Sequence, residues 1–403
     1  MARIAVFHNL PSGGAKRALF EWTRRLAERH TLDVFSLSTA NHGYCDLRPY
    51  TSDYQIADFE PLALFASPWG RLNQLQRWRD LGRLQAVYRR LAARIDAGGY
   101  DVVFSNSCSF TFIPLLQLYL QTPSVYYLHE HFANLVRRDV HRPYLKQNSA
   151  RQRLDRIDPF IPLYRNRLAT LQGAAVKRTP RLLANSEFTR RQFESDFHVP
   201  APVVNLGVDG AQFHPLNEGI RDRHLLSVGE LSPRKGFDFL VESLALVAPE
   251  KRPALRLACN NQIPEERAYI ENLAAQRGVR LEILTNLNGG QLLLEYNQAQ
   301  LCAYAPLQEP FGLVPLEAMA CGTPVLAVAE GGVCESVREG FNGRLTPRDP
   351  RRFAAALEDL LEDPVELSRL GKNGRQDVLE NWSWERSTGR LESHLLAAAA
   401  RES

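Results

Sequence analysis

Residues 309–325 read EPFGLVPLEAMACGTPV, and this stretch carries the strongest structural signal in the chain. Its middle, LVPLEAMA, has the composition of a helix, which Gly322 and Pro324 end in the usual way. Gly312, just before the helix, allows a backbone bend and the close approach of a ligand. The stretch therefore predicts a loop that leads into a helix.

Two features of this loop and helix favour a nucleotide-sugar ligand. Free N–H groups at a helix N-terminus, together with the positive end of the helix dipole, suit a phosphate or another anion. Glu309 lies in the loop, and the carboxylate of Glu317, in the first turns of the helix, can accept hydrogen bonds from the paired hydroxyls of a ribose. The N–H groups expected at the donor are those of Phe311, Gly312, Leu313 and Val314.

The whole segment resembles the E-x7-E element of the family 4 retaining glycosyltransferases, enzymes of the two-Rossmann-domain GT-B fold. The spacing of Glu309 and Glu317 matches, and so do PFG, EAMACGTPV and the later Gly331-Gly332. The resemblance implies that Glu309 contacts hydroxyls of the donor sugar and that Glu317 contacts the ribose. The alternative is a buried loop and helix of any α/β protein with both glutamates at the surface, and the 17-residue context favours the glycosyltransferase.

The rest of the chain predicts an α/β protein with two Rossmann-like, doubly wound parallel-sheet domains. A chain of 403 residues suits two domains of about 200 residues each. Strand and helix patterns alternate from RIAVFHN to SVYYLHEH, with a helix expected at FIPLLQLYLQ. A second series runs from HLLSVGE to a helix near residues 351–361.

The segment between the two series, VVNLGVDGAQFHPLNEG, is rich in Gly, Pro, Asn and Asp, as linkers are. Its GVD and F-x-P residues resemble the linker of the same enzyme family, and NWSWERSTGRLESHLL resembles that family's closing helix. We therefore expect an acceptor-binding domain over residues 1–205 and a donor-binding domain over 206–382. A C-terminal helix within 383–403 is expected to cross back onto the first domain.

The charge of the chain is uneven, although its formal net charge is only +4. Residues 1–217 carry 28 Lys and Arg against 18 Asp and Glu, and the remainder carries 21 against 27. A basic first half favours an anionic partner, such as a phospholipid surface, a polyprenyl phosphate or an acidic glycan. Nucleic acid is not expected, because no recognised nucleic-acid-binding module is present.

Two basic regions of the first half have two interpretations. The stretch WGRLNQLQRWRDLGRLQAVYRRLAARI, with Trp69 and Trp78, has the pattern of a basic amphipathic helix, and residues 137–181 hold twelve basic side chains against three acidic ones. Either region suits an anionic membrane or an acidic acceptor. Both also suit solvated helices that cover the first sheet.

Cysteine usage and hydropathy point to a cytoplasmic protein, peripheral to the inner face of the membrane at most. The six cysteines form no C-x-x-C pair, as expected for reduced thiols. The N-terminus enters a strand at once, without the apolar region of a signal peptide. The longest apolar run, near residues 110–120, is broken by Pro114 and Gln117 and is too short to span a membrane.

The turn after the first strand contains Gly13-Gly14, where backbone can approach a ligand. A dinucleotide-binding site fits poorly, because G-x-G-x-x-G is absent and the second strand ends in residues 36–39, SLST, without the ribose-binding acid. A plain turn fits the two glycines as well. Beside residues 309–325, they resemble the family's first-domain glycine loop, which faces donor phosphate or acceptor.

His129 follows the strand SVYYL at its carboxyl end, where ligands bind in open α/β sheets. A histidine there can bind a sugar hydroxyl or shield developing charge, or it can be purely structural. The resemblance favours the first role, because the family has a histidine near the donor sugar at this place.

Arg234 and Lys235 lie between a strand and a helix of the second series, in SVGELSPRKGF. Two adjacent cations at a strand's end suit a clamp for a leaving diphosphate, although a solvated basic turn is common. Lys235-Gly236 match the family's G-R-x…K-G pattern, but Glu230 stands where many members have the arginine. Whether Arg234 replaces that arginine is left open.

The resemblance implies a hexosyltransferase that moves a sugar from a UDP- or GDP-sugar to a hydroxyl of a glycan, lipid or small molecule, with retention of configuration. No metal or other cofactor is expected, since the chain has no Asp-x-Asp and no metal-ligand spacing. Base recognition is expected to use backbone groups near Leu287. The alternative is a catalytically silent GT-B protein that binds a nucleotide-sugar or glycan, which only Glu230 supports.

Overall fold

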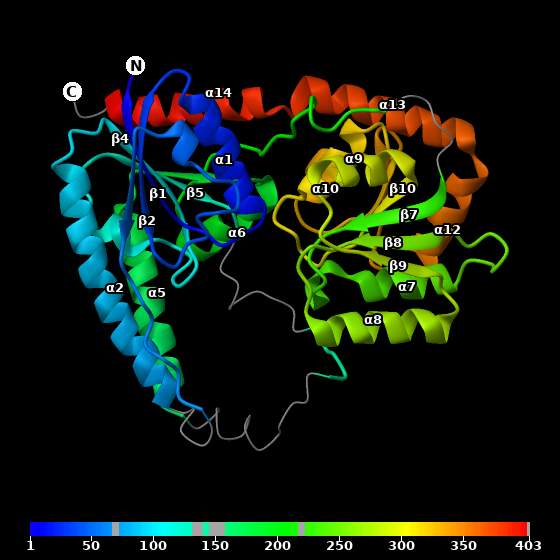
Figure 1. Ribbon diagram of the computed structural model, residues 1–403, viewed down its shortest axis with the longest axis horizontal. Helices are drawn as coiled ribbons and strands as arrows, with labels where there is room; N and C mark the ends of the chain where they lie inside the picture. Colours follow the sequence, from blue (N-terminus) through cyan, green and yellow to red (C-terminus); the bar gives the residue numbers. More distant parts are fainter. Residues whose placement is uncertain (67–71, 131–139, 145–157, 217–221, 401–403) are drawn as a thin grey trace.

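The computed structural model of the protein describes residues 1–66, 72–130, 140–144, 158–216 and 222–400, and it consists of two α/β halves side by side (Figure 1). Each half is built on one six-stranded sheet. Every strand pair in both sheets is parallel. The predicted fold class, two Rossmann-like parallel-sheet domains, is confirmed.

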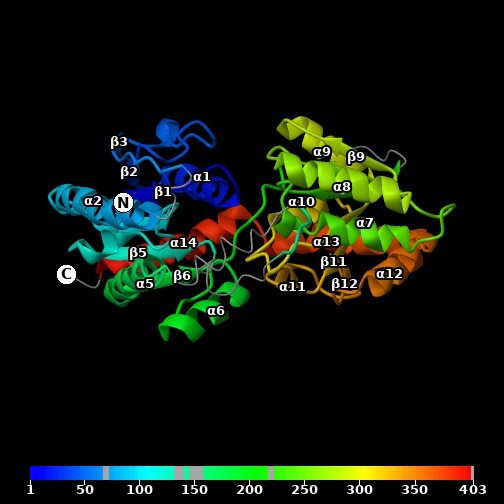
Figure 2. The same cartoon turned by 90° about the horizontal axis from the view of Figure 1, so that it is seen from below.

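The first sheet has the order β3-β2-β1-β4-β5-β6, and helices cover both of its faces (Figure 2). Its strands are β1 (Arg3–Asn9), β2 (Thr31–Leu37), β3 (Asp53–Ala57), β4 (Val102–Cys108), β5 (Ser124–Leu128) and β6 (Arg181–Ala184). The helices of this half are α1 (Gly14–Leu26), α2 (Asn73–Asp96), α5 (Phe160–Arg178) and α6 (Glu187–Phe197).

The second sheet has the order β12-β11-β10-β7-β8-β9, which is the order of the first sheet when its strands are renumbered from β7. Its strands are β7 (Asp222–Val228), β8 (Ala254–Ala258), β9 (Leu281–Leu284), β10 (Ala299–Tyr304), β11 (Val325–Val328) and β12 (Gly343–Thr346). The helices are α7 (Phe237–Ala245), α8 (Pro264–Arg277), α9 (Gly289–Gln298), α10 (Leu313–Ala320), α11 (Val333–Ser336), α12 (Pro350–Glu362), α13 (Pro364–Asn381) and α14 (Trp384–Ala399).

This shared order places the functional edges of both sheets. Successive strands are added toward one edge of the sheet and then toward the other, and this order reverses between β1 and β4 in the first sheet and between β7 and β10 in the second. Ligands of open α/β sheets bind at the carboxyl ends of the strands that flank such a switch point. The residues after β1, β4, β7 and β10 are therefore the ones to examine for a site.

The C-terminal helix α14 lies on the first sheet, so the chain crosses between the halves twice (Figure 1). The indole Nε1 of Trp22, on α1, donates to Ser387 Oγ at 3.0 Å, and the rings of Trp22 and Trp384 lie 5.9 Å apart. Gly207, in the linker, packs so tightly on this crossing that a Cβ there would lie 2.5 Å from the backbone of Ser383. The predicted domain boundary at 205/206 stays a prediction.

Several elements differ from the sequence-based expectation. The predicted helix at FIPLLQLYLQ is wrong: Pro114 is extended, and only a 3-10 turn, Leu115–Leu118, follows it. β3 and β6 were not predicted, because an edge strand of five residues and a strand of four are too short to show a period. Trp69, Arg137 and much of the basic region over residues 137–181 lie outside the described residues.

No helix in the described part of the chain combines the length and the hydropathy needed to cross a membrane.

Candidate functional site

The switch point of the second sheet is occupied by an ion pair between Lys235 and Glu309. Lys235 ends a 3-10 turn, Pro233–Lys235, after β7, and Glu309 follows β10. The Lys235 Nζ lies 2.9 Å from Glu309 Oε1 and 2.8 Å from Oε2, and the two side chains are 22% and 29% exposed. Two of the residues predicted to be catalytic therefore meet at the edge where the fold predicts a ligand.

Glycine positions explain how Lys235 reaches this place. Gly236 has φ +68°, and a Cβ there would lie 2.1 Å from the carbonyl oxygen of Ala305, at the end of β10. A Cβ on Gly229 would lie 3.3 Å from the Lys235 side chain, which crosses over it. The K-G dipeptide is thus a packing requirement, since only glycine lets the turn after β7 lie directly on β10.

The loop that carries Glu309 is held by the second glycine pair, Gly331-Gly332. A Cβ on Gly331 would lie 2.3 Å from the oxygen of Glu309, and one on Gly332 would lie 2.3 Å from the oxygen of Pro310. The N–H of Gly332 donates to the Glu309 oxygen at 2.9 Å. This contact fixes the loop backbone and leaves the Glu309 carboxylate to Lys235.

The start of α10 offers backbone donors beside this ion pair. Gly312 is the N-cap, with φ +96°, and a Cβ there would lie 2.8 Å from the hydroxyl of Tyr304. Within the described residues, no protein acceptor is found for the N–H groups of the four predicted residues, Phe311, Gly312, Leu313 and Val314. Unpaired donors and the positive end of the helix dipole make this place suitable for an anion.

Glu317 does not present the open carboxylate that the sequence led us to expect. Its residue is 3% exposed, and both oxygens are engaged. Arg17 Nη1 donates to Oε1 at 2.5 Å, and the Tyr296 hydroxyl donates to Oε2 at 2.7 Å. Arg17 comes from α1 in the other half, so a ribose at Glu317 has to share the carboxylate with this arginine or displace it.

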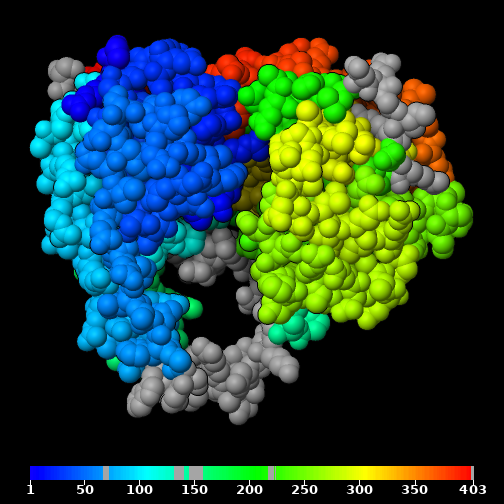
Figure 3. Space-filling view, viewed as in Figure 1, coloured from blue at the N-terminus to red at the C-terminus, as the bar shows by residue number. Residues whose placement is uncertain are grey.

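A cleft separates the blue first half from the yellow-green second half (Figure 3), and residues that follow β1 in the first half and β10 in the second approach each other across it. A Cβ on Gly14, at the start of α1, would lie 3.7 Å from Leu313 Cδ1, at the start of α10. Gly13 has open space around its Cα, with φ +137°. The structure therefore brings the predicted glycine loop against the predicted donor-binding helix.

Further contacts join the halves near Glu309. Ser186, the N-cap of α6, donates through Oγ to the Pro310 oxygen at 2.6 Å. The N–H groups of Glu187 and Phe188 donate to the carboxylate of Glu335, from α11, at 2.9 and 3.0 Å. A carboxylate at a helix N-terminus is a favourable arrangement, and here it spans the cleft.

His129 lies at the end of β5 and is 7% exposed. Its Nε2 lies 3.0 Å from Asn106 Oδ1, an acceptor, so Nε2 carries the proton and Nδ1 is the free acceptor. Nδ1 is buried and has no partner among the described residues. Burial lowers the pKa of His129 to about 3, so the imidazole is neutral and is able to accept a hydrogen bond from a hydroxyl.

A group of buried and half-buried polar residues at the first switch point was not predicted. Lys16, on α1, is fully buried, and its Nζ lies 3.2 Å from His8 Nε2. The Tyr54 hydroxyl lies 3.3 Å from the same nitrogen and 2.9 Å from His42 Nδ1. Burial lowers the pKa of Lys16 to about 8, partly offset by Cys45 and Asp46. No motif in the sequence links these scattered residues, so only Lys16, next to the glycine loop, offered a signal.

Arg234 and Glu230 stay apart from the ion pair. Within the described residues, neither side chain has a hydrogen-bond or ion-pair partner, and Glu230 is exposed. The main-chain oxygen of Arg234 accepts from Leu307 N at 2.8 Å, which ties the turn to the segment after β10.

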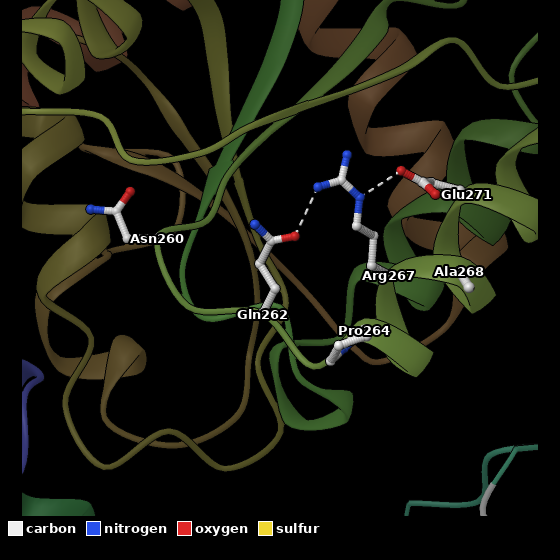
Figure 4. A pocket seen from close by; sticks show the side chains of 6 residues that line it. All are labelled: Asn260, Gln262, Pro264, Arg267, Ala268 and Glu271. Atoms are coloured by element: carbon white, nitrogen blue, oxygen red, sulfur yellow. Dashed lines mark hydrogen bonds and ion pairs between the residues drawn. The ribbon is translucent and has the colours of Figure 1, made fainter.

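An open cavity of about 420 Å³ lies at the carboxyl ends of β7 and β8 (Figure 4), and one of its lining residues, Asn260, binds the backbone of Leu287. Asn260 Oδ1 accepts from Leu287 N at 3.2 Å, and its Nδ2 donates to Leu287 O at 3.4 Å. Arg267 is held by Gln262 and Glu271, as the dashed lines show. The cavity is lined by Asn260, Gln262, Pro264, Arg267, Ala268 and Glu271. It contains none of the predicted site residues, but Asn260 joins it to the Leu287 backbone.

The described residues contain no group of three or more His, Cys, Asp or Glu side chains arranged to hold a metal ion.

Comparison with known proteins matches the two halves of the chain to two family descriptions. Residues 12–212 match Glycosyltransferase Family 4, and residues 211–377 match Glycosyl transferases group 1.

Among curated proteins, the chain is 32% identical over 234 residues to a D-inositol 3-phosphate glycosyltransferase of Thermobispora bispora. It is also 32% identical over 222 residues to an MMP alpha-(1->4)-mannosyltransferase of Mycolicibacterium hassiacum. The chain spans about half the length of these two relatives, 54% of the first and 53% of the second. The matches cover 52% and 53% of this chain, respectively. A D-inositol 3-phosphate glycosyltransferase of Geodermatophilus obscurus is 29% identical, over 96% of this chain and 85% of its own length.

Two solved structures share the whole fold. HepE from Anabaena, in complex with UDP and glucose, has a TM-score of 0.71 at 19% identity, over 98% of this chain and 100% of that one. Sucrose-phosphate synthase from Thermosynechococcus elongatus has a TM-score of 0.73 at 21% identity, over 99% and 100%. At these identities the similarity establishes the GT-B arrangement of the two halves.

Proposed function

The chain belongs to the group 1 and family 4 glycosyltransferases, and from this premise we propose that it transfers a hexose from a nucleotide-diphosphate sugar to an acceptor hydroxyl. The observation that carries this proposal is the Lys235–Glu309 pair at the second switch point, beside the unpaired N–H groups of α10. A cation, a carboxylate and a helix N-terminus at one edge supply what a sugar diphosphate requires.

Each part of this edge has a role in the proposal. Lys235, with Arg234, neutralises the diphosphate as it leaves, and the N–H groups at the start of α10 bind its oxygens. Glu309 accepts hydrogen bonds from donor-sugar hydroxyls and, in the absence of donor, holds Lys235 in place at 2.8 Å. HepE, which shares the fold, is known in complex with UDP-glucose, and this supports a UDP-sugar as the first donor to test.

The nucleoside of the donor is assigned to the same half. Glu317 accepts from the ribose hydroxyls after sharing or losing Arg17, and the backbone of Leu287, fixed by Asn260, contacts the base. The choice between UDP and GDP rests on this contact. Relatives named as inositol phosphate and mannosyl transferases leave the transferred sugar and the acceptor as matters for assay.

We propose that transfer proceeds with retention of configuration and without a metal ion. The leaving phosphate oxygen takes the proton of the acceptor hydroxyl as that oxygen attacks the same face of the sugar. The protein supplies position and charge compensation, through Lys235, Arg234 and α10. The neutral His129 accepts a hydrogen bond from a sugar hydroxyl through Nδ1 once a side-chain shift uncovers that buried atom, and Gly13-Gly14 let α1 approach the phosphates.

The acceptor is assigned to the first half, and the acceptor classes are a glycan, a lipid-linked saccharide or a small molecule. The basic character of this half supports a position on the anionic, cytoplasmic face of a membrane. The contacts between Arg17, Ser186 and Glu335 and their partners across the cleft imply that the halves close to exclude water during transfer.

One experiment tests the proposal directly. Thermal stabilisation of the purified protein is measured with a panel of UDP- and GDP-sugars, and the best donor is then incubated with candidate acceptors while free nucleoside diphosphate is measured. Stabilisation followed by release supports the proposal. Stabilisation without release under any acceptor supports the silent, nucleotide-sugar-binding alternative, and no stabilisation by any donor contradicts both.

A further inference from the structure

A second cavity lies in the first half, away from the Lys235–Glu309 pair, and its chemistry is different. It has a volume of about 380 Å³, within the range of small-molecule sites, and it lies between α2, α5 and the segments that follow β3 and β4. Its walls are mostly aromatic and aliphatic, with Phe59, Leu81, Leu84, Phe110 and Leu168 among them. We call this cavity the α2/α5 groove.

The groove reaches the first switch point at one end. Ser109 and Phe110, which line it, directly follow β4. Ser109 Oγ accepts from Asn9 Nδ2 at 3.1 Å, and its N–H donates to the Asn9 oxygen at 3.0 Å. Asn9 ends β1 and precedes the Gly13-Gly14 turn. The inner end of the groove therefore adjoins the first switch point, in the half assigned to the acceptor.

At the other end, the groove reaches the tip formed by the first turns of α2 and α5, which lie side by side at the lower left of Figure 1. Leu64 lines the groove and is 54% exposed. The segment around it is tied to α2, since Leu62 N donates to Asp80 and Phe65 N donates to Asn73. The space-filling view shows this segment and the start of α2 projecting at the lower left (Figure 3).

Six exposed large apolar side chains come from this tip, and we call them the apolar tip. They are Leu64, Phe65, Leu72, Trp78, Phe160 and Leu163. Exposed apolar side chains from three segments at one place mark a binding surface. Isolated exposed leucines elsewhere on the protein, such as Leu246, need no such explanation.

The helices that form the groove are strongly basic. α2 carries six arginines and two aspartates, and α5 carries four basic residues and no acidic one. Arg77 lines the groove, is exposed, and has no ion-pair partner within the described residues. The other charged residue of the lining, Asp80, pairs with Arg83 at 2.9 Å, which leaves Arg77 as the uncompensated charge. Apolar side chains with an uncompensated arginine among them match an amphiphile with a hydrocarbon chain and negative charge, rather than a neutral glycan or an apolar protein surface.

We propose that the α2/α5 groove holds the hydrocarbon chain of an anionic, lipid-linked acceptor, which the apolar tip draws from a lipid surface. The polar end of this acceptor lies at the first switch point, with its hydroxyl toward the cleft. The identification of the bound lipid as the acceptor rests on the proposed function. The groove itself is tested independently of transfer.

The probe is dodecyl phosphate below its micelle-forming concentration, with butyl phosphate as the same headgroup without the long chain. Binding to the full-length protein is measured by calorimetry. Dodecyl phosphate is expected to bind at least tenfold more tightly than butyl phosphate. Leu62→Trp, which fills the groove, and Leu64→Glu, which charges its mouth, are each expected to weaken dodecyl phosphate binding at least tenfold.

Leu246→Glu is the matched control, because Leu246 is 52% exposed, on the second half, against 54% for Leu64. This variant is expected to bind as the wild type does. All variants are also tested for stabilisation by the nucleotide-sugar found in the donor panel, which should be unchanged. If dodecyl phosphate binds while no donor stabilises the protein, the groove assignment holds and the proposed transfer fails.

Four outcomes overturn the assignment. The first is equal binding of the two phosphates, and the second is normal binding by Leu62→Trp and Leu64→Glu. The third uses vesicles of 30% phosphatidylglycerol in phosphatidylcholine. If wild type and Leu62→Trp co-sediment equally with these vesicles while dodecyl phosphate does not bind, the apolar tip only docks on a bilayer. A dimer in light scattering that Leu64→Glu dissolves would likewise assign the tip to a second copy of the chain.

Discussion

The two switch points have the same topology but opposite electrostatics. At the second, the charges are compensated where they stand: Lys235 pairs with Glu309, and glycines at 229, 236, 331 and 332 let backbone and side chain pack around the pair. At the first, a buried lysine, Lys16, meets only a histidine nitrogen, and no carboxylate pairs with it among the described residues. The same strand order therefore supports one edge whose cation is paired with a carboxylate and one whose buried cation has no carboxylate beside it.

This difference indicates that the two switch points respond differently to an anionic ligand. At the second edge, Lys235 can turn from Glu309 to a diphosphate and keep an anionic partner, while sugar hydroxyls take its place at the Glu309 carboxylate. A buried cation without a counterion instead raises the energy of the unliganded state, and it favours whatever removes the charge or supplies an anion.

Removal of either member of the Lys235–Glu309 pair should abolish most of the activity. Lys235→Ala and Glu309→Gln are each expected to lower turnover by about 100-fold or more, since one lost charge-stabilising contact costs roughly that much. The measurement is nucleoside diphosphate release at saturating donor, with circular dichroism to show that the fold is intact. Near-normal turnover by a folded variant would break the assignment of the charged edge.

Lys16 should make the stability of the protein depend on pH. Its pKa is about 8 in the folded chain and 10.5 when unperturbed, so between these values the unfolded chain binds more protons. The contribution of Lys16 to the free energy of unfolding should then rise with pH through this window, by up to roughly 3 kcal/mol, while buried cysteines and tyrosines, whose pKa values burial raises, act in the opposite direction. Urea denaturation from pH 7.5 to 10 measures it.

The control for this test is Lys16→Met, which keeps the length of the side chain and removes the charge. Cys45 and Tyr54, whose pKa values burial raises, are present in both proteins, so the difference between the two curves isolates Lys16. A difference that does not change with pH would mean that Lys16 has an ordinary pKa, and the contrast between the edges would then be lost.

Gly236→Ala should destabilise the second half more than its backbone angle alone explains. Gly236 and Gly340 both have φ +68°, but a Cβ on Gly236 meets the Ala305 oxygen at 2.1 Å and one on Gly340 meets nothing within 4 Å. We expect about 1 kcal/mol for Gly340→Ala and at least about twice that for Gly236→Ala. Equal losses in urea denaturation would remove the packing reason for the K-G dipeptide.

Arg17→Ala tests the contact between the two switch points, where Arg17 of the first half binds Glu317 of the second. Without Arg17, the Glu317 Oε1 that it occupies at 2.5 Å becomes available to a ribose. UDP is therefore expected to bind a few-fold more tightly to this variant than to the wild type, by calorimetry. Arg234→Ala, which removes an arginine of the second half that has no partner in the described structure, is expected to weaken UDP binding instead. Weaker UDP binding by Arg17→Ala would mean that Arg17 contacts the nucleotide directly.

The arrangement at the second switch point was largely predictable, because most of its residues are close in sequence; their roles stay predictions. Glu309, Gly312 and Glu317 lie on one loop and helix, so their spacing alone placed them together. Lys235 was found because a short K-G signature follows a strand. In contrast, His8, Lys16, His42 and Tyr54 come from separate segments, each with an ordinary composition, and no local pattern joins them.

By itself, the sequence determined two parallel α/β halves, the family and the loop with its two glutamates, because periodicity and local spacing encode them. It placed neither the partners of those glutamates nor the groove. Only tertiary structure decided that Lys235, 74 residues away, holds Glu309, and that Arg17, 300 residues away, holds Glu317. The physical reason is that ion pairs and cavities form between side chains from distant segments, whose contact depends on how whole elements pack.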